Sequence, residues 1–229
     1  MLPRRQLSRE AARRVGSRRD FSRDRRGRRE VLRRASLGVH PTSPEHQLHG
    51  SLVEVLGVGV LILGPSGVGK SECVIELVRR GQRLVADDVV RFRQVDEGRG
   101  LLGWSPEHIR HFIEVRGLGL MSVSDLFGSE ATLDECKVGF VVRLEEWESG
   151  VEFERIGLDR LRETIFGVEL PAVVLPVHAA SNIATLVELA VRDWQLRERG
   201  INAARRLDER LRSVGGMLGS PGAIDGEGI

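Results

Sequence analysis

Short apolar runs separated by polar loops dominate the middle of the chain. Ser51–Leu56 alternates between apolar and polar residues and Val58–Leu63 is apolar throughout, so each segment predicts a β-strand. Ser71–Arg80 has apolar residues at helical spacing and precedes Gly81, which is typical of a helix end. It therefore predicts an α-helix. Further strands are predicted at Arg83–Ala86, Val89–Arg93, Val138–Leu144 and Ala172–Leu175, and a further helix at Ala203–Arg212.

A longer helix is predicted before the last one. Ser181 or Asn182 can cap its start, apolar residues recur at helical spacing over Ile183–Trp194, and Gly200 ends it. An apolar stripe of this kind is more often part of a core than of an interface. Gly98–Gly103 is rich in glycine and predicts a turn region.

The order of these elements predicts an α/β fold. Strands alternate with helices, and several strands follow one another without a helix between them, so the sheet is expected to be mixed. Hydrophobic residues make up 41% of the 229 residues and aromatic residues only 4%, which predicts a core of Val, Leu and Ile. No stretch approaches about 18 consecutive apolar residues, which argues against a transmembrane helix.

The net charge of +2 conceals an uneven distribution. Residues 1–36 contain 14 arginines and 4 acidic residues, a net charge of about +10, and the rest of the chain is acidic. This segment predicts a basic, disordered arm. It can be a solvated tail or an upstream extension of the reading frame, a segment that attracts nucleic acid non-specifically, or a targeting peptide. No apolar segment follows Arg18-Arg19, so an export signal is not expected. Residues 213–229 predict a flexible C-terminal tail.

Cysteine and lysine are both rare in this chain. Cys73 and Cys136 are too few for a disulfide scaffold or a four-ligand zinc site, which indicates a reducing compartment such as the cytoplasm. Lys70 and Lys137 are the two lysines of the sequence. Because lysine is so rare here, a lysine inside a motif is expected to have a role in that motif.

Residues 64–71 match the phosphate-binding pattern G-x-x-x-x-G-K-[ST]. Glycines let backbone N–H groups curl around phosphate oxygens, and the following helix directs its N-terminal dipole at the anion. Lys70 would reach the β- and γ-phosphates, and the Ser71 hydroxyl would bind Mg²⁺. The alternative is a glycine-rich turn without a ligand. The predicted nucleotide-binding residues are Gly64, Pro65, Ser66, Gly67, Val68, Gly69, Lys70 and Ser71.

The strand predicted at Arg83–Ala86 ends in two adjacent carboxylates, Asp87 and Asp88. In a P-loop protein such an acid lies beside Mg²⁺. Because side chains alternate along a strand, one carboxylate can serve the metal while the other faces the phosphoryl acceptor. Two nearby like charges also raise one pKa, which suits a general base. The alternative is that the pair forms a turn after the strand.

Several stretches of the chain, from His49 to about Arg212, together resemble the catalytic domain of the HPr kinase/phosphorylase family, and we expect residues 40–212 to form that domain. The resemblance implies a P-loop α/β core with one mixed sheet, related to that of phosphoenolpyruvate carboxykinases. It also implies a kinase that uses ATP and Mg²⁺ to phosphorylate a serine of the small phosphocarrier protein HPr, with reversal by phosphorolysis in many members. Family members form hexamers, so a homo-oligomer is implied. The stretches that carry the resemblance are His49–Gly50, Gly57–Gly64, Gly67–Glu72, Arg80–Asp88 and Ile113–Gly119.

The resemblance also implies roles for individual residues. Asp88 is preferred over Asp87 as the base that accepts the proton of the substrate serine, and as the proton donor in reverse. His49 and Arg155 fall where the family has a catalytic histidine and a catalytic arginine. The implied catalytic residues are His49, Lys70, Asp87, Asp88 and Arg155, and the implied Mg²⁺ ligands are Ser71 and Glu114.

Three of these residues have structural alternatives. His49 can be a hydrogen-bonded histidine near a strand start, and Arg155 a surface charge among acidic neighbours. Glu114 can be an ion-pair partner of Arg116 or Arg110. The role of Arg116 is open.

Two features depart from the family pattern. About 40 residues precede His49, so we expect a short form without the separate N-terminal domain of full-length members. After the strand predicted at Ala172–Leu175 the family typically has Pro-Val-Arg-Pro-Gly-Arg-Asn, whereas Pro176–Asn182 lacks both arginines. That loop is associated with dephosphorylation, so we expect readily measured kinase activity and weak phosphorolysis.

Two other functions fit the same residues. A P-loop kinase of this architecture can act on another acceptor, either a small molecule or a different protein. A nucleotide-sensing regulator without turnover is the second alternative, and the complete set of candidate catalytic residues argues against it. The sequence leaves open whether ATP or pyrophosphate is the donor.

Overall fold

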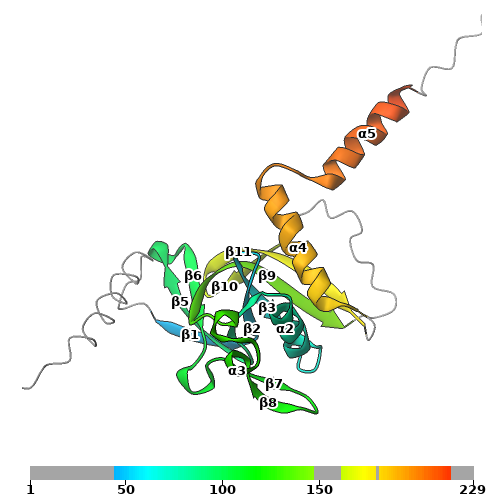
Figure 1. Ribbon diagram of the computed structural model, residues 1–229. Helices are drawn as coiled ribbons and strands as arrows, with labels where there is room; N and C mark the ends of the chain where they lie inside the picture. The colour runs from blue at the N-terminus through cyan, green and yellow to red at the C-terminus, as the bar shows by residue number, and fades with distance from the viewer. Residues whose placement is uncertain (1–43, 147–160, 179–180, 218–229) are drawn as a thin grey trace, which may run out of the picture. The chain divides into compact units, whose positions relative to one another are not determined.

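The computed structural model describes residues 44–146, 161–178 and 181–217 (Figure 1). The described residues form a mixed α/β architecture, which confirms the predicted fold class. The strands are β1 (Glu45–His49), β2 (Ser51–Val55), β3 (Val58–Leu63), β4 (Arg83–Ala86), β5 (Val89–Val95), β6 (Gly100–Trp104), β7 (Phe112–Val115), β8 (Gly119–Ser122), β9 (Glu135–Glu146), β10 (Leu161–Ile165) and β11 (Val168–Val177). The helices are α2 (Lys70–Arg79), α3 (Val123–Phe127), α4 (Ile183–Glu198) and α5 (Ala203–Met217), with 3₁₀ turns η1 (Asp96–Gly98), η2 (Glu107–Ile109) and η3 (Ser129–Ala131).

Nine of the described strands form one mixed sheet. Its order is β1-β5-β6-β9-β3-β2-β4, and β11 adds to β9 while β10 pairs with β11. The β3–β9 and β9–β11 pairs are parallel, and the remaining pairs are antiparallel. β7 and β8 form a separate hairpin. The parallel centre places the carboxyl ends of β3 and β9 at one edge, where ligands of α/β sheets commonly bind.

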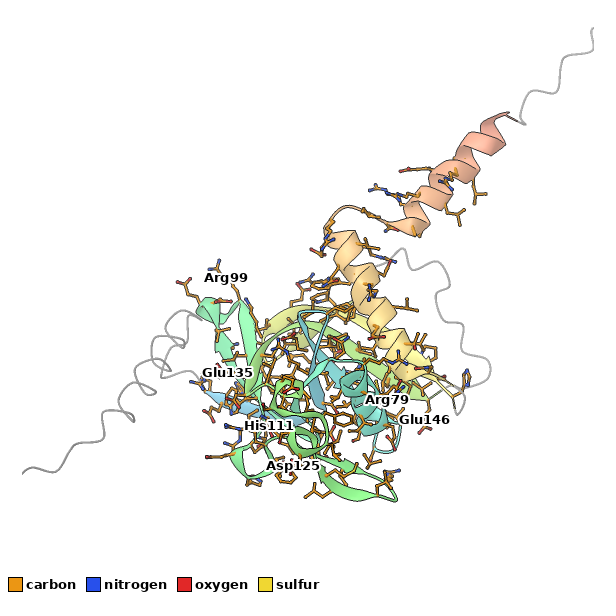
Figure 2. The ribbon with its side chains drawn as sticks, viewed as in Figure 1. Arg79, Arg99, His111, Asp125, Glu135 and Glu146 are labelled. Atoms are coloured by element: carbon orange, nitrogen blue, oxygen red, sulfur yellow. The ribbon has the colours of Figure 1, made fainter. Side chains whose placement is uncertain are left out.

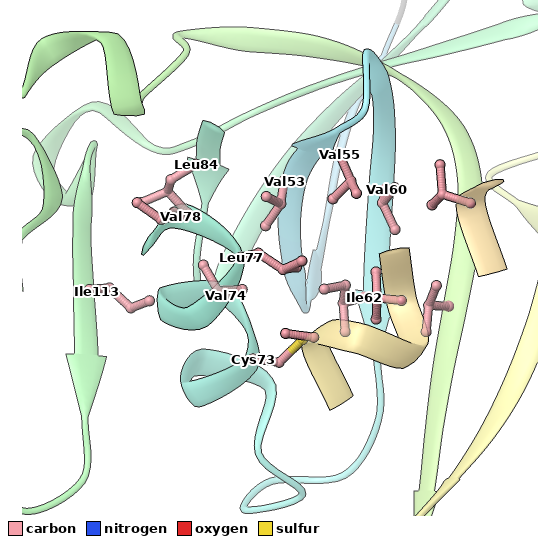
Figure 3. Packing of buried hydrophobic residues seen from close by; sticks show 14 of the residues in the cluster. Val53, Val55, Val60, Ile62, Cys73, Val74, Leu77, Val78, Leu84 and Ile113 are labelled. Carbon is pink, nitrogen blue, oxygen red and sulfur yellow. The ribbon is translucent and has the colours of Figure 1, made fainter. Parts of the chain in front are cut away.

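The central strands are buried on both faces, which explains why β3 is apolar throughout. Val60 and Ile62 point to the face covered by α2 and α4, and Leu61 and Leu63 belong to the core on the opposite face. Figure 3 shows the first of these cores, with Leu77 of α2 facing the strands.

Helix α4 packs its apolar stripe into the same core as α2. Ala184, Val187 and Val191 are almost completely buried, so the expectation that this stripe is core is confirmed. Of the two predicted caps, Asn182 is the N-cap, and its side chain accepts a hydrogen bond from the Thr185 N–H over 3.2 Å. This cap fixes where α4 begins after β11.

The turn predicted at Gly98–Gly103 is wrong, because β6 runs through most of it. Its glycines allow close packing within a strand instead of a reversal of the chain. A Cβ on Gly103 would lie 2.5 Å from Leu52 Cδ2, and one on Gly100 would lie 2.7 Å from Asp96 Oδ2.

The last helix is longer than the sequence indicated. α5 continues to Met217, whereas the expected helix ends at residue 212 and the expected tail begins at residue 213. The basic arm of residues 1–36 lies outside the described residues. Among the helices that the structure describes, none has the length and apolar character needed to cross a membrane.

Candidate active site

The glycine-rich segment Gly64–Gly69 joins the end of β3 to α2, as the sequence predicts. Gly64, Gly67 and Gly69 have φ values of 151°, 90° and 98°, which side chains disfavour. A Cβ on Gly64 would also lie 2.7 Å from the carbonyl oxygen of Leu144. Gly69 caps α2 without a side-chain hydrogen bond, so the first N–H groups of the helix are available to an anion.

Two cations lie on this loop. Lys70 Nζ donates hydrogen bonds of 2.8 Å to the carbonyl oxygens of Gly64 and Pro65. Arg116 Nη2 donates to Ser66 Oγ over 3.3 Å from the turn between β7 and β8. The two positive charges favour binding of a polyphosphate. The sequence alone leaves the role of Arg116 open, since the approach of a hairpin turn to a distant loop has no local pattern.

The β7–β8 hairpin also carries Glu114. Ile113 is buried in the core beside α2 (Figure 3), so the alternation of side chains turns its neighbour Glu114 to the exposed face. Arg110 lies 3.7 Å from Asp134, and Arg116 contacts the loop, so neither arginine pairs with Glu114 among the described contacts. The ion-pair alternative for Glu114 is therefore wrong.

Asp87 is buried between two serine hydroxyls. Ser51 Oγ donates to Asp87 Oδ1 over 2.6 Å, and Ser71 Oγ donates to Asp87 Oδ2 over 2.9 Å. The Asp87 carboxylate, which directly follows β4, is thereby held against the first turn of α2. The sequence had no signal for Ser51, which lies in an apolar strand.

The pKa of Asp87 is raised above its usual value, and burial is the main cause. Hydrogen bonds from Ser51, Ser71 and the Asp88 backbone oppose the rise, and the charge of Asp88 adds the smallest contribution. The expectation that like charges raise one pKa of this pair therefore has the right direction, but desolvation is the larger cause.

Asp88 points away from the core, beside His49. Its φ of 66° turns the chain after β4, and its backbone oxygen accepts a 3.1 Å hydrogen bond from the Gly50 N–H. His49 Nδ1 lies 3.2 Å from the Asp88 backbone oxygen and 3.5 Å from Asp88 Oδ1. The two side chains are 83% and 76% exposed, so both are accessible to a second molecule. The turn at Asp88 therefore separates its exposed carboxylate from the buried carboxylate of Asp87.

A pocket of about 490 Å³ lies between His49 and the start of the phosphate loop. It is lined by His49, Gly64 and Pro65, and on its far wall by Arg143 and Glu163, which form an ion pair. We call it the acceptor-side pocket. A group that enters it meets the start of the loop on one side and His49 on the other.

An arginine cluster ties α2 to the start of α4. Arg80 Nε donates to Glu76 over 2.9 Å, and its Nη1 donates to Thr185 and Glu188 over 2.9 Å each. Arg80 Nη2 reaches the cap residue Asn182 over 3.3 Å. The neighbouring Arg79, labelled in Figure 2, also pairs with Glu76. These contacts fix the N-terminus of α4 against α2.

Two predicted features lie partly or wholly outside the described residues. Arg155 is one, and nothing about its position follows from the structure. In the loop Pro176–Asn182, residues 179–180 are also outside. Within the described part of this loop, Ser181 Oγ accepts a 3.0 Å hydrogen bond from the His178 N–H.

The donor set fits the binding of ATP with Mg²⁺. A hydroxyl and carboxylates are the oxygen ligands that Mg²⁺ prefers, and Ser71, Asp87 and Glu114 supply them near the loop or on the hairpin that contacts it. No group of three or more His, Cys, Asp or Glu side chains that could hold a metal occurs in the described ranges.

Comparisons with known proteins agree with this geometry. Residues 41–211 match the family model described as the HPr Serine kinase C-terminal domain. The HPr kinase/phosphorylase of Bacillus cytotoxicus is 46% identical over 172 residues, which cover 75% of this chain and 55% of that protein. The enzyme of the same name from Geobacillus thermodenitrificans is 46% identical over 169 residues, covering 74% of this chain and 54% of its own length. The chain thus spans about half the length of the curated relatives it matches.

A solved structure shows the same fold. The Hpr(Ser) kinase/phosphatase from Coxiella burnetii superposes with a TM-score of 0.62 at 30% sequence identity. The match covers 68% of this chain and 93% of that chain.

Proposed function

The chain belongs to the HPr serine kinase C-terminal domain family, and we propose that it transfers the γ-phosphate of ATP to a serine hydroxyl of an HPr-like phosphocarrier protein. One observation supports this most directly. The two adjacent carboxylates are separated, with Asp87 held on the Ser71 hydroxyl of the loop helix and Asp88 exposed beside His49. A phosphoryl transferase needs this division between a donor side and an acceptor side.

On the donor side, the phosphate loop would bind the triphosphate through the N–H groups at the start of α2. Lys70 and Arg116 would neutralise charge that spreads over the oxygens of the transferred group. Ser71 and Glu114 would hold Mg²⁺, which when bound neutralises phosphate charge and orients the γ-phosphate. Asp87 would fix the orientation of the Ser71 hydroxyl.

On the acceptor side, Asp88 would accept the proton of the incoming serine. An exposed carboxylate can approach the hydroxyl of a docked protein without rearrangement of the core. His49 lies within contact distance of Asp88 and would orient its carboxylate. We assign Arg155 the role of stabilising the developing charge, on the family resemblance. A base positioned in this way contributes about 10²- to 10⁴-fold to a rate.

We expect phosphorolysis to be weak. The loop Pro176–Asn182 lacks the two arginines typical of the family, and arginine is the side chain best suited to binding inorganic phosphate. Comparable rates of phosphorylation and of phosphate-driven removal in purified protein would contradict this expectation.

The same loop favours a second candidate. A kinase of this architecture with a different acceptor would keep the loop, Asp87 and Asp88 and differ where the acceptor docks. The altered loop Pro176–Asn182 is the observation that supports it.

The test is incubation with ATP, Mg²⁺ and candidate HPr-like proteins, followed by intact mass measurement and site mapping. We expect one phosphate on a serine of the acceptor, and no transfer by Lys70→Ala. Phosphate on a histidine, or no modified acceptor, would overturn the proposed reaction. Transfer to a different protein would instead support the second candidate.

We also propose a cytoplasmic location and a homo-oligomeric assembly. ATP and a phosphocarrier acceptor indicate the cytoplasm, and the free thiols of Cys73 and Cys136 agree with a reducing compartment. We propose a homo-oligomer on the family resemblance, and light scattering of the purified chain tests it.

A further inference from the structure

Pockets lie on two sides of the phosphate loop. The acceptor-side pocket includes Gly64 and Pro65 at the start of the loop. A second pocket, of about 360 Å³, lies beyond the end of the loop, between the first turns of α2 and the start of α4. Glu72 and Glu76 line it from α2, and Ser181 and Asn182 line it from the other side. We call it the helix-side pocket.

The direction of phosphoryl transfer distinguishes the two pockets. The attacking and leaving oxygens lie roughly in line across the transferred group, so the acceptor and the rest of the donor occupy opposite sides of it. His49 lines the acceptor-side pocket and contacts Asp88, which marks the side of attack. The leaving part of the donor must then extend away from Gly64 and toward the end of the loop, where the helix-side pocket begins.

From this geometry we propose that the helix-side pocket binds the nucleoside of the donor, with the Glu72 carboxylate accepting hydrogen bonds from ribose hydroxyls. The inference rests on the proposed function, in that the phosphate loop binds the donor phosphates. The donor is then a ribonucleoside triphosphate and not pyrophosphate, because pyrophosphate has no nucleoside to occupy this pocket.

The charge of the helix-side pocket agrees with an uncharged ligand rich in hydrogen-bond donors. Glu72 is exposed and Glu76 is ionised, since its hydrogen bonds from Arg79 and Arg80 lower its pKa to about 2. Carboxylates repel a phosphate, whereas they accept hydrogen bonds from hydroxyl and amino groups. An acidic residue that binds ribose hydroxyls is a general device of nucleotide sites.

The walls of the pocket are fixed by contacts already described. Arg80 joins Glu76 on one wall to the cap residue Asn182 on the other. Ile183, which is half-buried, supplies apolar surface against which a base can pack. Another pocket of about 430 Å³ lies beside Trp194, but unlike the helix-side pocket it is lined by no residue of α2, the helix that follows the phosphate loop.

The test compares binding of ATP, 2′-deoxy-ATP and pyrophosphate by calorimetry, in Mg²⁺ and without an acceptor protein. The wild-type chain should prefer ATP to 2′-deoxy-ATP by about tenfold. In Glu72→Ala we expect ATP affinity to fall by about tenfold and this preference to vanish, because the variant lacks the hydrogen-bond acceptor for the hydroxyl. Pyrophosphate affinity should be unchanged.

Two further variants complete the experiment. Ser181→Phe fills the pocket from the α4 side and should weaken ATP binding by more than tenfold without changing pyrophosphate binding. Glu107→Ala, which removes an exposed glutamate that lines neither pocket, should change neither. Circular dichroism checks that each variant is folded.

Several outcomes would overturn the inference: equal affinity of the wild type for ATP and 2′-deoxy-ATP, unchanged ATP binding in Glu72→Ala, or parallel loss of ATP and pyrophosphate. Binding of pyrophosphate without binding of ATP would overturn it as well. Normal ATP selectivity without phosphorylation of any HPr-like protein would support the inference and contradict only the proposed acceptor.

Discussion

Ser71 and Asp87 are sixteen positions apart in the chain, and the Ser71 hydroxyl donates a 2.9 Å hydrogen bond to Asp87 Oδ2. This bond joins the first turn of α2 to the end of β4. It commits one carboxylate of the pair to the phosphate loop, and the positive φ of Asp88 turns the other carboxylate outward. The two predicted roles are therefore divided between neighbouring residues by a single turn of the backbone.

Asp88→Asn should lower kcat by about 100-fold or more and leave the KM for ATP nearly unchanged, because an amide cannot accept the serine proton. Steady-state kinetics with an HPr-like acceptor provide the measurement. Asp208→Asn on α5 is a matched control and should retain full activity. A kcat for Asp88→Asn within tenfold of wild type would show that another group is the base.

Gly67→Ala should weaken ATP binding by about tenfold, since the added Cβ would lie 2.8 Å from Arg116 Nη1. The φ of Gly67 is 90°, so about 1–2 kcal/mol of backbone strain is also expected. Gly57→Ala is the control, because its φ is 81° and nothing lies within 4 Å of its Cβ. Calorimetry measures the ATP affinity, which reports the crowding of Arg116, and thermal denaturation measures the stability, which reports the backbone strain. Equal ATP affinity in the two variants would argue against contact between Arg116 and the loop.

Glu76 should stabilise the fold in a pH-dependent way. Its pKa falls from 4.5 to about 2, mainly because Arg79 and Arg80 donate hydrogen bonds to its carboxylate. A lowered pKa contributes stability that is complete above 4.5 and is lost as the pH falls toward about 2. Urea midpoints should therefore favour wild type over Glu76→Gln at pH 7, and less so at pH 3.

The matched control for Glu76→Gln is Glu209→Gln on α5, which changes an exposed glutamate and should leave the urea midpoint at pH 7 unchanged. A difference between wild type and Glu76→Gln that stays constant from pH 7 to pH 3 would contradict the assigned ion pairs.

Arg80→Lys should loosen the start of α4. Arg80 donates to Thr185, Glu188 and Asn182 through two nitrogens of a planar fork, which a lysine ammonium cannot reproduce. Amide hydrogen exchange in the first two turns of α4 should accelerate, while exchange in β3 should be unchanged. Arg79→Lys is the control, since the Arg79 guanidinium pairs with Glu76 within α2. Equal exchange in both variants would show that the cluster does not hold α4.

Part of the site was predictable because its patterns are local. A glycine-rich loop between an apolar strand and a helix is visible within a dozen residues. An apolar strand followed directly by Asp87 and Asp88 is likewise a pattern of neighbouring residues. The turn predicted at Gly98–Gly103 was wrong for a physical reason. Its glycines allow close packing of β6: a Cβ on Gly103 would meet Leu52 of the distant strand β2, and one on Gly100 would meet Asp96 of the turn that precedes β6.

The sequence by itself determined the fold class, the phosphate loop and the family, because the periods of strands and helices and the conformational freedom of glycine are properties of short segments. The tertiary structure alone decided that Asp87 lies on Ser71 while Asp88 meets His49. It also decided that Arg116 reaches the loop and that Arg80 joins Glu76 to Asn182 across the helix-side pocket. These relationships depend on contacts between elements far apart in the chain, and no local pattern encodes such contacts.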